Sequence, residues 1–221
     1  MNTERKIIPV DQDAVSAVVS IPGRVQDGTG ILIAHGAGND MENPLIVHLA
    51  EGLADAGYLT VRFNFPYKEK GRKGPDPQKT LVRTWQCVVR FVRENYGLST
   101  VVAAGKSMGG RVASQAAADG SILPDRLIFF GYPLHPPGKK DRLRDAHLYD
   151  LKTPMLFFAG TRDALCDLAL LKTVLEKLAA PWSLDIVDGG DHSFNTLKSM
   201  NLNRQDVYDQ ILQSTIAWLG S

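Results

Sequence analysis

Short apolar runs of strand length alternate along the chain with longer stretches in which apolar residues recur every three or four positions. The strand-like runs are predicted at residues 14–21, 30–34, 58–65, 100–104, 126–130, 155–159 and 183–187. The helical patterns are predicted at residues 44–56, 78–96, 110–118, 169–179 and 204–219. Because strands and helices alternate without a break in composition, we expect an α/β fold with a mostly parallel sheet and helices on both faces.

Two of these segments show how the pattern is interpreted. The run at 30–34, Gly-Ile-Leu-Ile-Ala, has no polar side chain, which is typical of a strand covered on both faces. The stretch at 78–96 instead forms an apolar stripe along one side of a helix, made of Leu81, Trp85, Val88, Val89 and Val92. We therefore predict that residues 1–221 form a single domain with its core at about residues 13–219.

Chemistry-bearing residues follow four of the predicted strands. A glycine-rich turn, His35-Gly-Ala-Gly-Asn-Asp, comes after the strand at 30–34, and Ser107 comes shortly after the strand at 100–104. Asp163 follows the strand at 155–159, and His192 follows the strand at 183–187. In a parallel α/β sheet, ligands bind beyond the carboxyl ends of the strands, so these residues are expected to meet at one edge.

The serine lies in the pentapeptide Gly105-Lys-Ser-Met-Gly109, directly after an apolar run. A strand followed by Gly-x-Ser-x-Gly is typical of a nucleophile elbow, a tight turn that exposes a serine hydroxyl. An ordinary glycine-rich turn is the alternative. A phosphate-binding loop would need a glycine five residues before Gly105, and that position is Thr100, so this interpretation fails.

The order serine, aspartate, histidine predicts an acyl-transfer site. A serine hydroxyl is a poor nucleophile until a base takes its proton, and the imidazole of His192 is suited to that task. Asp163 would orient the imidazole. Asp167 lies close by in the sequence and is the alternative for this position, while Asp163 itself could be a helix cap.

A tetrahedral oxyanion requires two hydrogen-bond donors. We predict the backbone N–H groups of Met108 and Ala37, with Gly38 as the alternative to Ala37. His35 is expected to bond the backbone and to shape this loop. Asp191, beside the predicted base, is expected to be a turn residue.

These motifs resemble the α/β-hydrolase superfamily, whose catalytic residues run serine, acid, histidine along the chain. The segment 130–139, Phe-Gly-Tyr-Pro-Leu-His-Pro-Pro-Gly-Lys, is similar to one found in small, lidless, dienelactone-hydrolase-like serine hydrolases related to testis-expressed and chromatin-associated α/β-hydrolase-like proteins. The resemblance implies a single-domain α/β-hydrolase fold without a lid domain. Dienelactone hydrolases use a cysteine nucleophile where this chain has Ser107, which weakens any transfer of their substrate.

The substrate pocket is less well defined by the sequence. We predict substrate contacts from Tyr67, Tyr132 and Leu134, which follow two of the predicted strands. The loop 66–74 is basic and either attracts an anionic substrate or is simply solvated; its cations are Lys68, Lys70, Arg72 and Lys73. The stretch 134–150 is too short for a lid domain, so an open site is expected.

Composition narrows the remaining possibilities. The net charge is +1 and 44% of residues are hydrophobic, so neither nucleic acid nor a membrane is expected as a partner. Cys87 and Cys166 are not spaced as a metal site or a redox pair, and we expect no metal and no cofactor. The N-terminus lacks the apolar stretch of a signal peptide, which predicts a cytoplasmic protein. Homodimer formation stays open.

The expected function is a serine hydrolase that acts on small ester or thioester substrates through an acyl-enzyme. The alternative is a catalytically silent α/β-hydrolase scaffold for protein interaction or small-molecule binding. An ordered Ser107, Asp163 and His192 favours the enzyme, because a scaffold has no need of a strained serine.

Overall fold

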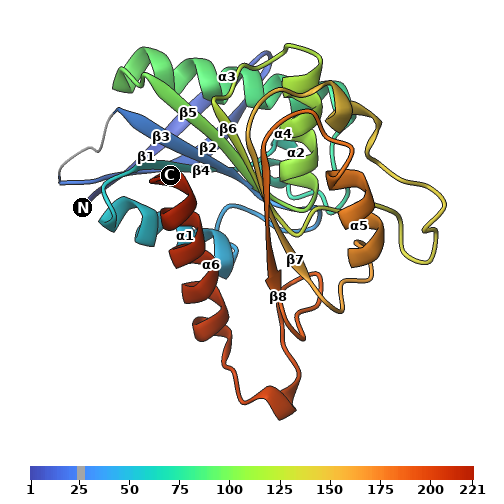
Figure 1. Cartoon of the computed structure of the whole chain (residues 1–221). Helices are drawn as coiled ribbons and strands as arrows, with labels where there is room; N and C mark the ends of the chain where they lie inside the picture. The colour runs from blue at the N-terminus through green and yellow to red at the C-terminus, as the bar shows by residue number, and fades with distance from the viewer. Residues whose placement is uncertain (24–27) are drawn as a thin grey trace.

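An eight-stranded sheet forms the centre of the computed structural model, which describes residues 1–23 and 28–221 (Figure 1). Its strands are β1 (Asn2–Val10), β2 (Asp13–Ile21), β3 (Thr29–Ala34), β4 (Leu59–Phe63), β5 (Thr100–Lys106), β6 (Arg126–Phe130), β7 (Met155–Gly160) and β8 (Trp182–Val187). The spatial order is β1-β2-β4-β3-β5-β6-β7-β8. The pairs β1–β2 and β2–β4 are antiparallel and the other pairs are parallel. The mostly parallel α/β sheet expected from the sequence is confirmed.

Helices cover both faces of this sheet (Figure 1). One face is covered by α1 (Pro44–Asp55) and α6 (Arg204–Leu219), and the opposite face by α3 (Gln78–Tyr96), α4 (Met108–Ala118) and α5 (Leu168–Leu175). A short α2 (Pro66–Glu69) and two 3-10 turns, at Ala146–Asp150 and Lys198–Met200, lie in the connections. Each face has its own apolar cluster, so the sheet is buried on both sides as its sequence pattern predicts.

The first strand was not predicted from the sequence. Residues 2–10 consist of five polar side chains followed by four apolar ones, and only the apolar ones on one side are buried: Ile8 and Val10 are covered, while Ile7 is 66% exposed. The strand pairs with β2 along its whole length through a tight turn at Asp11. A half-exposed edge strand therefore carries a weaker hydrophobic signal than the buried parallel strands.

The other elements agree with the sequence pattern, and the differences lie at their ends. The strand β5 runs to Lys106 rather than to residue 104, and α4 begins at Met108 rather than at residue 110. Strand and helix are thus separated by Ser107 alone, which is a sharper turn than the sequence predicted. The helix α5 ends at Leu175, four residues earlier than expected.

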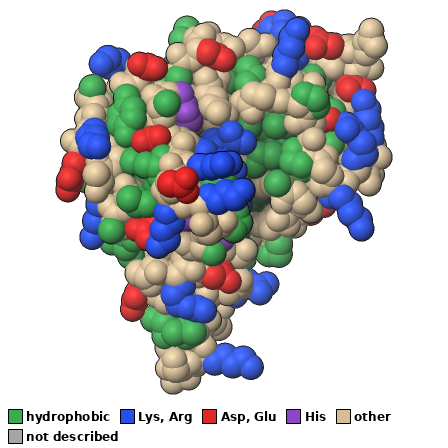
Figure 2. Space-filling model, turned by 90° about the vertical axis from the view of Figure 1, so that its right-hand side faces the viewer, with side chains coloured by type: hydrophobic (Ala, Val, Ile, Leu, Met, Phe, Trp, Pro, Cys, Tyr) green, Lys and Arg blue, Asp and Glu red, His purple; other side chains and the backbone are tan. Residues whose placement is uncertain are grey.

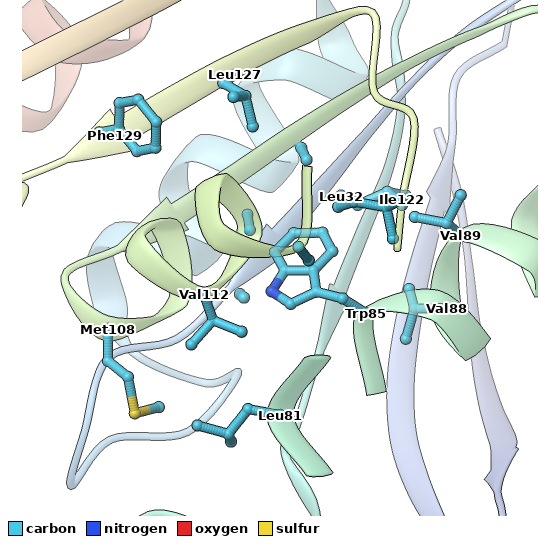
Figure 3. Packing of buried hydrophobic residues seen from close by; sticks show 14 of the residues in the cluster. Leu32, Leu81, Trp85, Val88, Val89, Met108, Val112, Ile122, Leu127 and Phe129 are labelled. Atoms are coloured by element: carbon cyan, nitrogen blue, oxygen red, sulfur yellow. The ribbon is translucent and has the colours of Figure 1, made fainter. Parts of the chain in front are cut away.

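The helix that follows the serine is anchored by close packing. Trp85 of α3 is fully buried, and it lies near Val112 of α4 and Leu32 of the sheet (Figure 3). Its ring meets Phe63 edge to face, with centroids 5.1 Å apart. Met108 at the start of α4 joins the same cluster. The first turn of α4 is therefore held rigidly against the sheet.

Candidate active site

The turn between β5 and α4 has the strained geometry of a nucleophile elbow. Ser107 has φ 51° and ψ −115°, a conformation that costs a non-glycine residue energy and persists only where the surroundings impose it. A Cβ on Gly105 would lie 2.2 Å from the Gly110 nitrogen, and one on Gly109 would lie 2.6 Å from the Ala34 oxygen. The two motif glycines therefore allow strand and helix to approach closely enough to form this turn.

The structure brings the three predicted catalytic residues together in one hydrogen-bonded chain. Nε2 of His192 lies 2.8 Å from Oγ of Ser107, and Nδ1 of His192 lies 2.7 Å from Oδ2 of Asp163. The Asp163 side chain has no exposed surface, whereas the His192 side chain is 22% exposed. The segment between β8 and α6, which carries the histidine, extends beyond the sheet at the lower end of the view in Figure 1. The imidazole thus links a buried carboxylate to the strained serine.

The two aspartates that the sequence left open are separated by their contacts. Asp163 also accepts a hydrogen bond at Oδ1 from the Leu165 backbone at 2.7 Å, which fixes the carboxylate plane. Asp167 is the N-cap of α5 and accepts hydrogen bonds from the first turn of that helix. Its Oδ2 is also 2.5 Å from Lys140, which lowers the pKa of Asp167. Asp163 is therefore the carboxylate that contacts the histidine.

The glycine-rich turn after β3 lies beside the serine. His35 is fully buried: its Nδ1 donates to the Gly36 carbonyl at 2.9 Å, and its Nε2 accepts from the Phe65 backbone at 3.1 Å. His35 thus shapes this loop, as expected. In the part of the chain that the structure describes, the N–H groups of Ala37 and Met108 donate no hydrogen bond to the protein. Both remain available to an incoming oxygen atom.

We expect the free energy of unfolding to fall as the pH is lowered from about 6.5 toward 4. Burial lowers the pKa of His35 from 6.5 to about 4, and burial also lowers the pKa of His147 to about 4. Between pH 6.5 and 4 these histidines bind protons in the unfolded chain but stay neutral in the folded protein. The stability that is present above pH 6.5 is therefore lost as the pH falls through this range. Urea unfolding at several pH values measures the slope. The variant His35→Asn should show a shallower slope, and equal slopes would contradict the assignment.

A pocket of about 400 Å³ opens at the serine. Ser107, His192 and Ala37 line it together with six further polar side chains and with four apolar or aromatic ones, namely Pro44, Leu45, Leu165 and Tyr208. Those polar side chains are Asn39, Asn43, Lys106, Ser193, Asn195 and Arg204. The sequence did not identify these lining residues. It predicted only that the loops after the strands would meet at this edge of the sheet.

The residues predicted to contact substrate lie elsewhere. Tyr67, Tyr132 and Leu134 are at most 1% exposed and belong to the apolar cluster beneath the sheet, so they do not line the pocket at Ser107. Tyr67 donates to the Gly36 carbonyl at 3.3 Å, and Tyr132 donates to the Arg144 carbonyl at 2.7 Å. Their aromatic rings turn inward because the strand ends cover the core there. Both tyrosines support loops rather than a substrate.

The basic loop is largely paired with nearby carboxylates. Lys70 lies 2.6 Å from Asp13, Lys68 lies 4.0 Å from Asp40, and Arg72 pairs with Asp76. None of these cations lines the pocket at the serine. On the face shown in Figure 2, basic and acidic side chains are interspersed. The loop therefore matches the solvated alternative better than a site for an anionic substrate.

Among the described residues, the two cysteines form no disulfide and no metal site. Cys87 and Cys166 are both buried and unpaired, and burial raises the pKa of the Cys166 thiol to about 12. Within residues 1–23 and 28–221, no three His, Cys, Asp or Glu side chains are grouped as metal ligands. In the same residues, no helix combines the length and the apolar character needed to cross a bilayer.

A mostly parallel sheet that places a strained serine, a histidine and an aspartate at its carboxyl edge is the arrangement of the α/β serine hydrolase fold. The chain belongs to the α/β hydrolase domain family, whose model matches residues 27–220. The matched range includes Ser107, Asp163 and His192, so the family agrees with the geometry of the site.

Solved structures of low sequence identity share this fold. A serine hydrolase homologue from Coxiella burnetii has a TM-score of 0.77 at 20% identity, covering 97% of this chain and 98% of that one. A serine hydrolase without lid from Xanthomonas campestris has a TM-score of 0.78 at 21% identity, covering 99% and 95%. A dienelactone hydrolase from Anabaena variabilis has a TM-score of 0.78 at 21% identity, covering 98% and 96%. At these identities the similarity establishes the fold alone.

Proposed function

We propose that this protein is a serine hydrolase that cleaves small ester, thioester or related acyl substrates through a Ser107 acyl-enzyme. One observation carries the proposal: the hydroxyl of a strained serine lies 2.8 Å from Nε2 of His192, at the mouth of a pocket. A hydroxyl in this position can lose its proton to the imidazole as it attacks a carbonyl carbon.

In the proposed reaction, Ser107 Oγ forms a bond to the acyl carbon while His192 Nε2 takes the hydroxyl proton. The imidazolium then returns that proton to the leaving group, and a water molecule repeats the sequence to release the acid. Asp163 accepts the hydrogen bond from Nδ1 of His192 at 2.7 Å, so it orients the ring and stabilises its charged form. The proton taken from the serine stays on the imidazole and is not passed on to the aspartate.

The oxyanion of the tetrahedral intermediate is assigned to the N–H groups of Met108 and Ala37. Met108 begins α4, so its N–H adds the positive end of the helix dipole to the site. Gly36 precedes Ala37, and a Cβ on Gly36 would lie 3.3 Å from Cβ of Ser107, so this loop runs alongside the nucleophile. Each such donor typically stabilises the transition state by about 3–4 kcal/mol.

The proposed substrate is small and soluble. Residues 134–150 form an extended connection with one 3-10 turn, so nothing of lid size lies between β6 and β7. The pocket of about 400 Å³ is small, and its lining combines amide, hydroxyl and cationic groups with the side chains of Pro44, Leu45, Leu165 and Tyr208. We also propose that the protein is related to the testis-expressed and chromatin-associated α/β-hydrolase-like proteins, because residues 130–139 resemble a segment of that group.

Labelling with a fluorophosphonate probe tests the proposal. We expect one covalent adduct on Ser107, detected by intact mass and peptide mapping, and no adduct on Ser107→Ala. The matched control is Ser114→Ala, because Ser114 also lies 2.8 Å from a histidine ring nitrogen but has ordinary helical backbone geometry. Labelling should persist in this control.

A panel of p-nitrophenyl esters of increasing chain length, run beside acyl thioesters, then defines the acyl preference. Short acyl groups should be cleaved fastest, since the pocket has a volume of only about 400 Å³. Folded protein that neither labels nor hydrolyses any of these substrates would refute the enzyme and favour the silent scaffold instead.

A further inference from the structure

We propose that Lys106 is a positioning residue for catalysis: its ammonium group holds the backbone of His192 so that the imidazole stays within reach of Ser107. This inference rests on the proposed function, because it assigns a role within the same reaction. The residue directly precedes the nucleophile, and the sequence drew attention to it only through the rejected phosphate-binding motif.

Lys106, at the end of β5, contacts the loop that carries His192. Nζ of Lys106 donates to the backbone carbonyl of His192 at 2.5 Å. The same Nζ lies 5.4 Å from the ring centroid of Phe194, a cation–π distance. Phe194 is fully buried and has φ 61°, so the histidine sits in a sharply turned segment that needs an anchor. Lys106 ties this segment to the rigid strand that also carries the serine.

The neighbouring chain leaves room for this ammonium group. Gly131 follows β6 with φ 72°, and a Cβ there would lie 3.0 Å from Nζ of Lys106 and 3.6 Å from Cε1 of His192. A side chain at this position would therefore push against both the lysine and the histidine. On the other side, a Cβ on Gly36 would lie 3.7 Å from Cγ of Lys106. The lysine side chain thus lies between Gly36 and Gly131, where the absence of side chains leaves room for it.

The charge of this buried lysine is compensated locally. Lys106 is 7% exposed, and burial lowers its pKa to about 8, opposed by the carboxylates of Asp163 and Asp191. These two carboxylates and the imidazole of His192 are the titratable groups that face it. Burying an ammonium is costly unless it is well bonded, so a purely apolar residue would fill this space more cheaply. Its charge-assisted hydrogen bond to the His192 carbonyl is therefore functionally significant.

Two alternatives make different kinetic predictions. If Lys106 instead bound an anionic part of the substrate, its removal would raise KM and leave the reactivity of Ser107 toward a small neutral probe unchanged. If it only filled space, an uncharged side chain of similar length would preserve kcat. A positioning role predicts a lower kcat and slower probe labelling, with KM nearly unchanged.

The first test compares Lys106→Met, Lys106→Gln and the exposed control Lys177→Met. In the Met variant, we expect kcat and the fluorophosphonate labelling rate to fall roughly 10- to 100-fold, as for a displaced catalytic group, with KM changed less than about 3-fold. The Gln variant keeps an N–H donor and should recover part of the loss. The Lys177→Met control should match wild type.

The second test uses the wild-type protein and needs no variant to fold. Its labelling rate, measured from pH 6 to 10, should decline roughly 5-fold as the ammonium is lost above pH 8, because a neutral amine donates a weaker hydrogen bond. A histidine base alone would give a plateau there. A plateau to pH 10, or a folded Met variant that labels as fast as wild type, overturns the proposal. Wild-type protein that does not label at all refutes the hydrolase function instead.

Discussion

Replacing Asp163 with asparagine is expected to lower kcat about 10⁴-fold while the protein stays folded. The carboxylate accepts the hydrogen bond from Nδ1 of His192 at 2.7 Å, which leaves Nε2 unprotonated toward Ser107 at 2.8 Å. An asparagine that turned its amide nitrogen toward Nδ1 would stabilise the opposite tautomer, with a proton on Nε2. His192 could not then take the serine proton.

The matched control is Asp167→Asn, four residues further along the same connection. Asp167 caps α5 and pairs with Lys140, and asparagine is as good an N-cap as aspartate. We expect this variant to keep kcat within about 2-fold and to lose less than about 1 kcal/mol of stability. Steady-state kinetics on the best ester, with urea unfolding of both variants, measures the contrast. Equal losses of kcat in the two variants would contradict the assignment of Asp163.

The candidate site could be predicted from the sequence because its parts follow parallel strands. Ser107, Asp163 and His192 come shortly after β5, β7 and β8, and these strands end at the same edge of the sheet. The prediction needed only the apolar runs and the order of three side chains. The runs of β5 and β7 are clear because no polar side chain interrupts residues 101–105 or 155–160, whereas β8 contains Ser183 and Asp185.

The substrate pocket could not be predicted in the same way. Tyr132 and Leu134 also follow a strand, yet their side chains turn into the core, and the direction of a side chain in an irregular turn is not encoded by periodicity. The polar residues that do line the pocket, such as Asn195 and Arg204, come from the loop after His192 and from the start of α6, and no motif marks them as lining residues. Their position depends on tertiary packing rather than on local pattern.

The position of the Lys106 side chain could not be predicted from the sequence either. A lysine at the end of an apolar strand is ordinarily expected to reach solvent, whereas here it is buried against the histidine loop. Only the contact with the His192 carbonyl, 86 residues away in the sequence, shows why a cation is present. A partner at that separation leaves no trace in the local sequence.

The elbow itself supports the second large effect: Gly105→Ala is expected to destabilise the protein by more than about 4 kcal/mol or to prevent folding. The added Cβ would lie 2.2 Å from the Gly110 nitrogen and 2.5 Å from the Gly109 carbonyl carbon, both backbone atoms of the helix that follows the serine. Backbone cannot rotate aside as a flexible side chain can, so strand and helix would have to separate. Such a separation would also disturb the apolar cluster that contains Met108, Val112 and Trp85.

Gly74→Ala is the matched control for this steric argument. A Cβ on Gly74 meets no atom within 4 Å, and its φ is not positive, so the same chemical change should alter stability by less than about 1 kcal/mol. Urea unfolding of the two variants compares them directly. A Gly105→Ala protein as stable as the Gly74→Ala protein would mean that the elbow is loose. Ser107 would then have no imposed strain, and the strongest structural argument for its role as a nucleophile would fall with it.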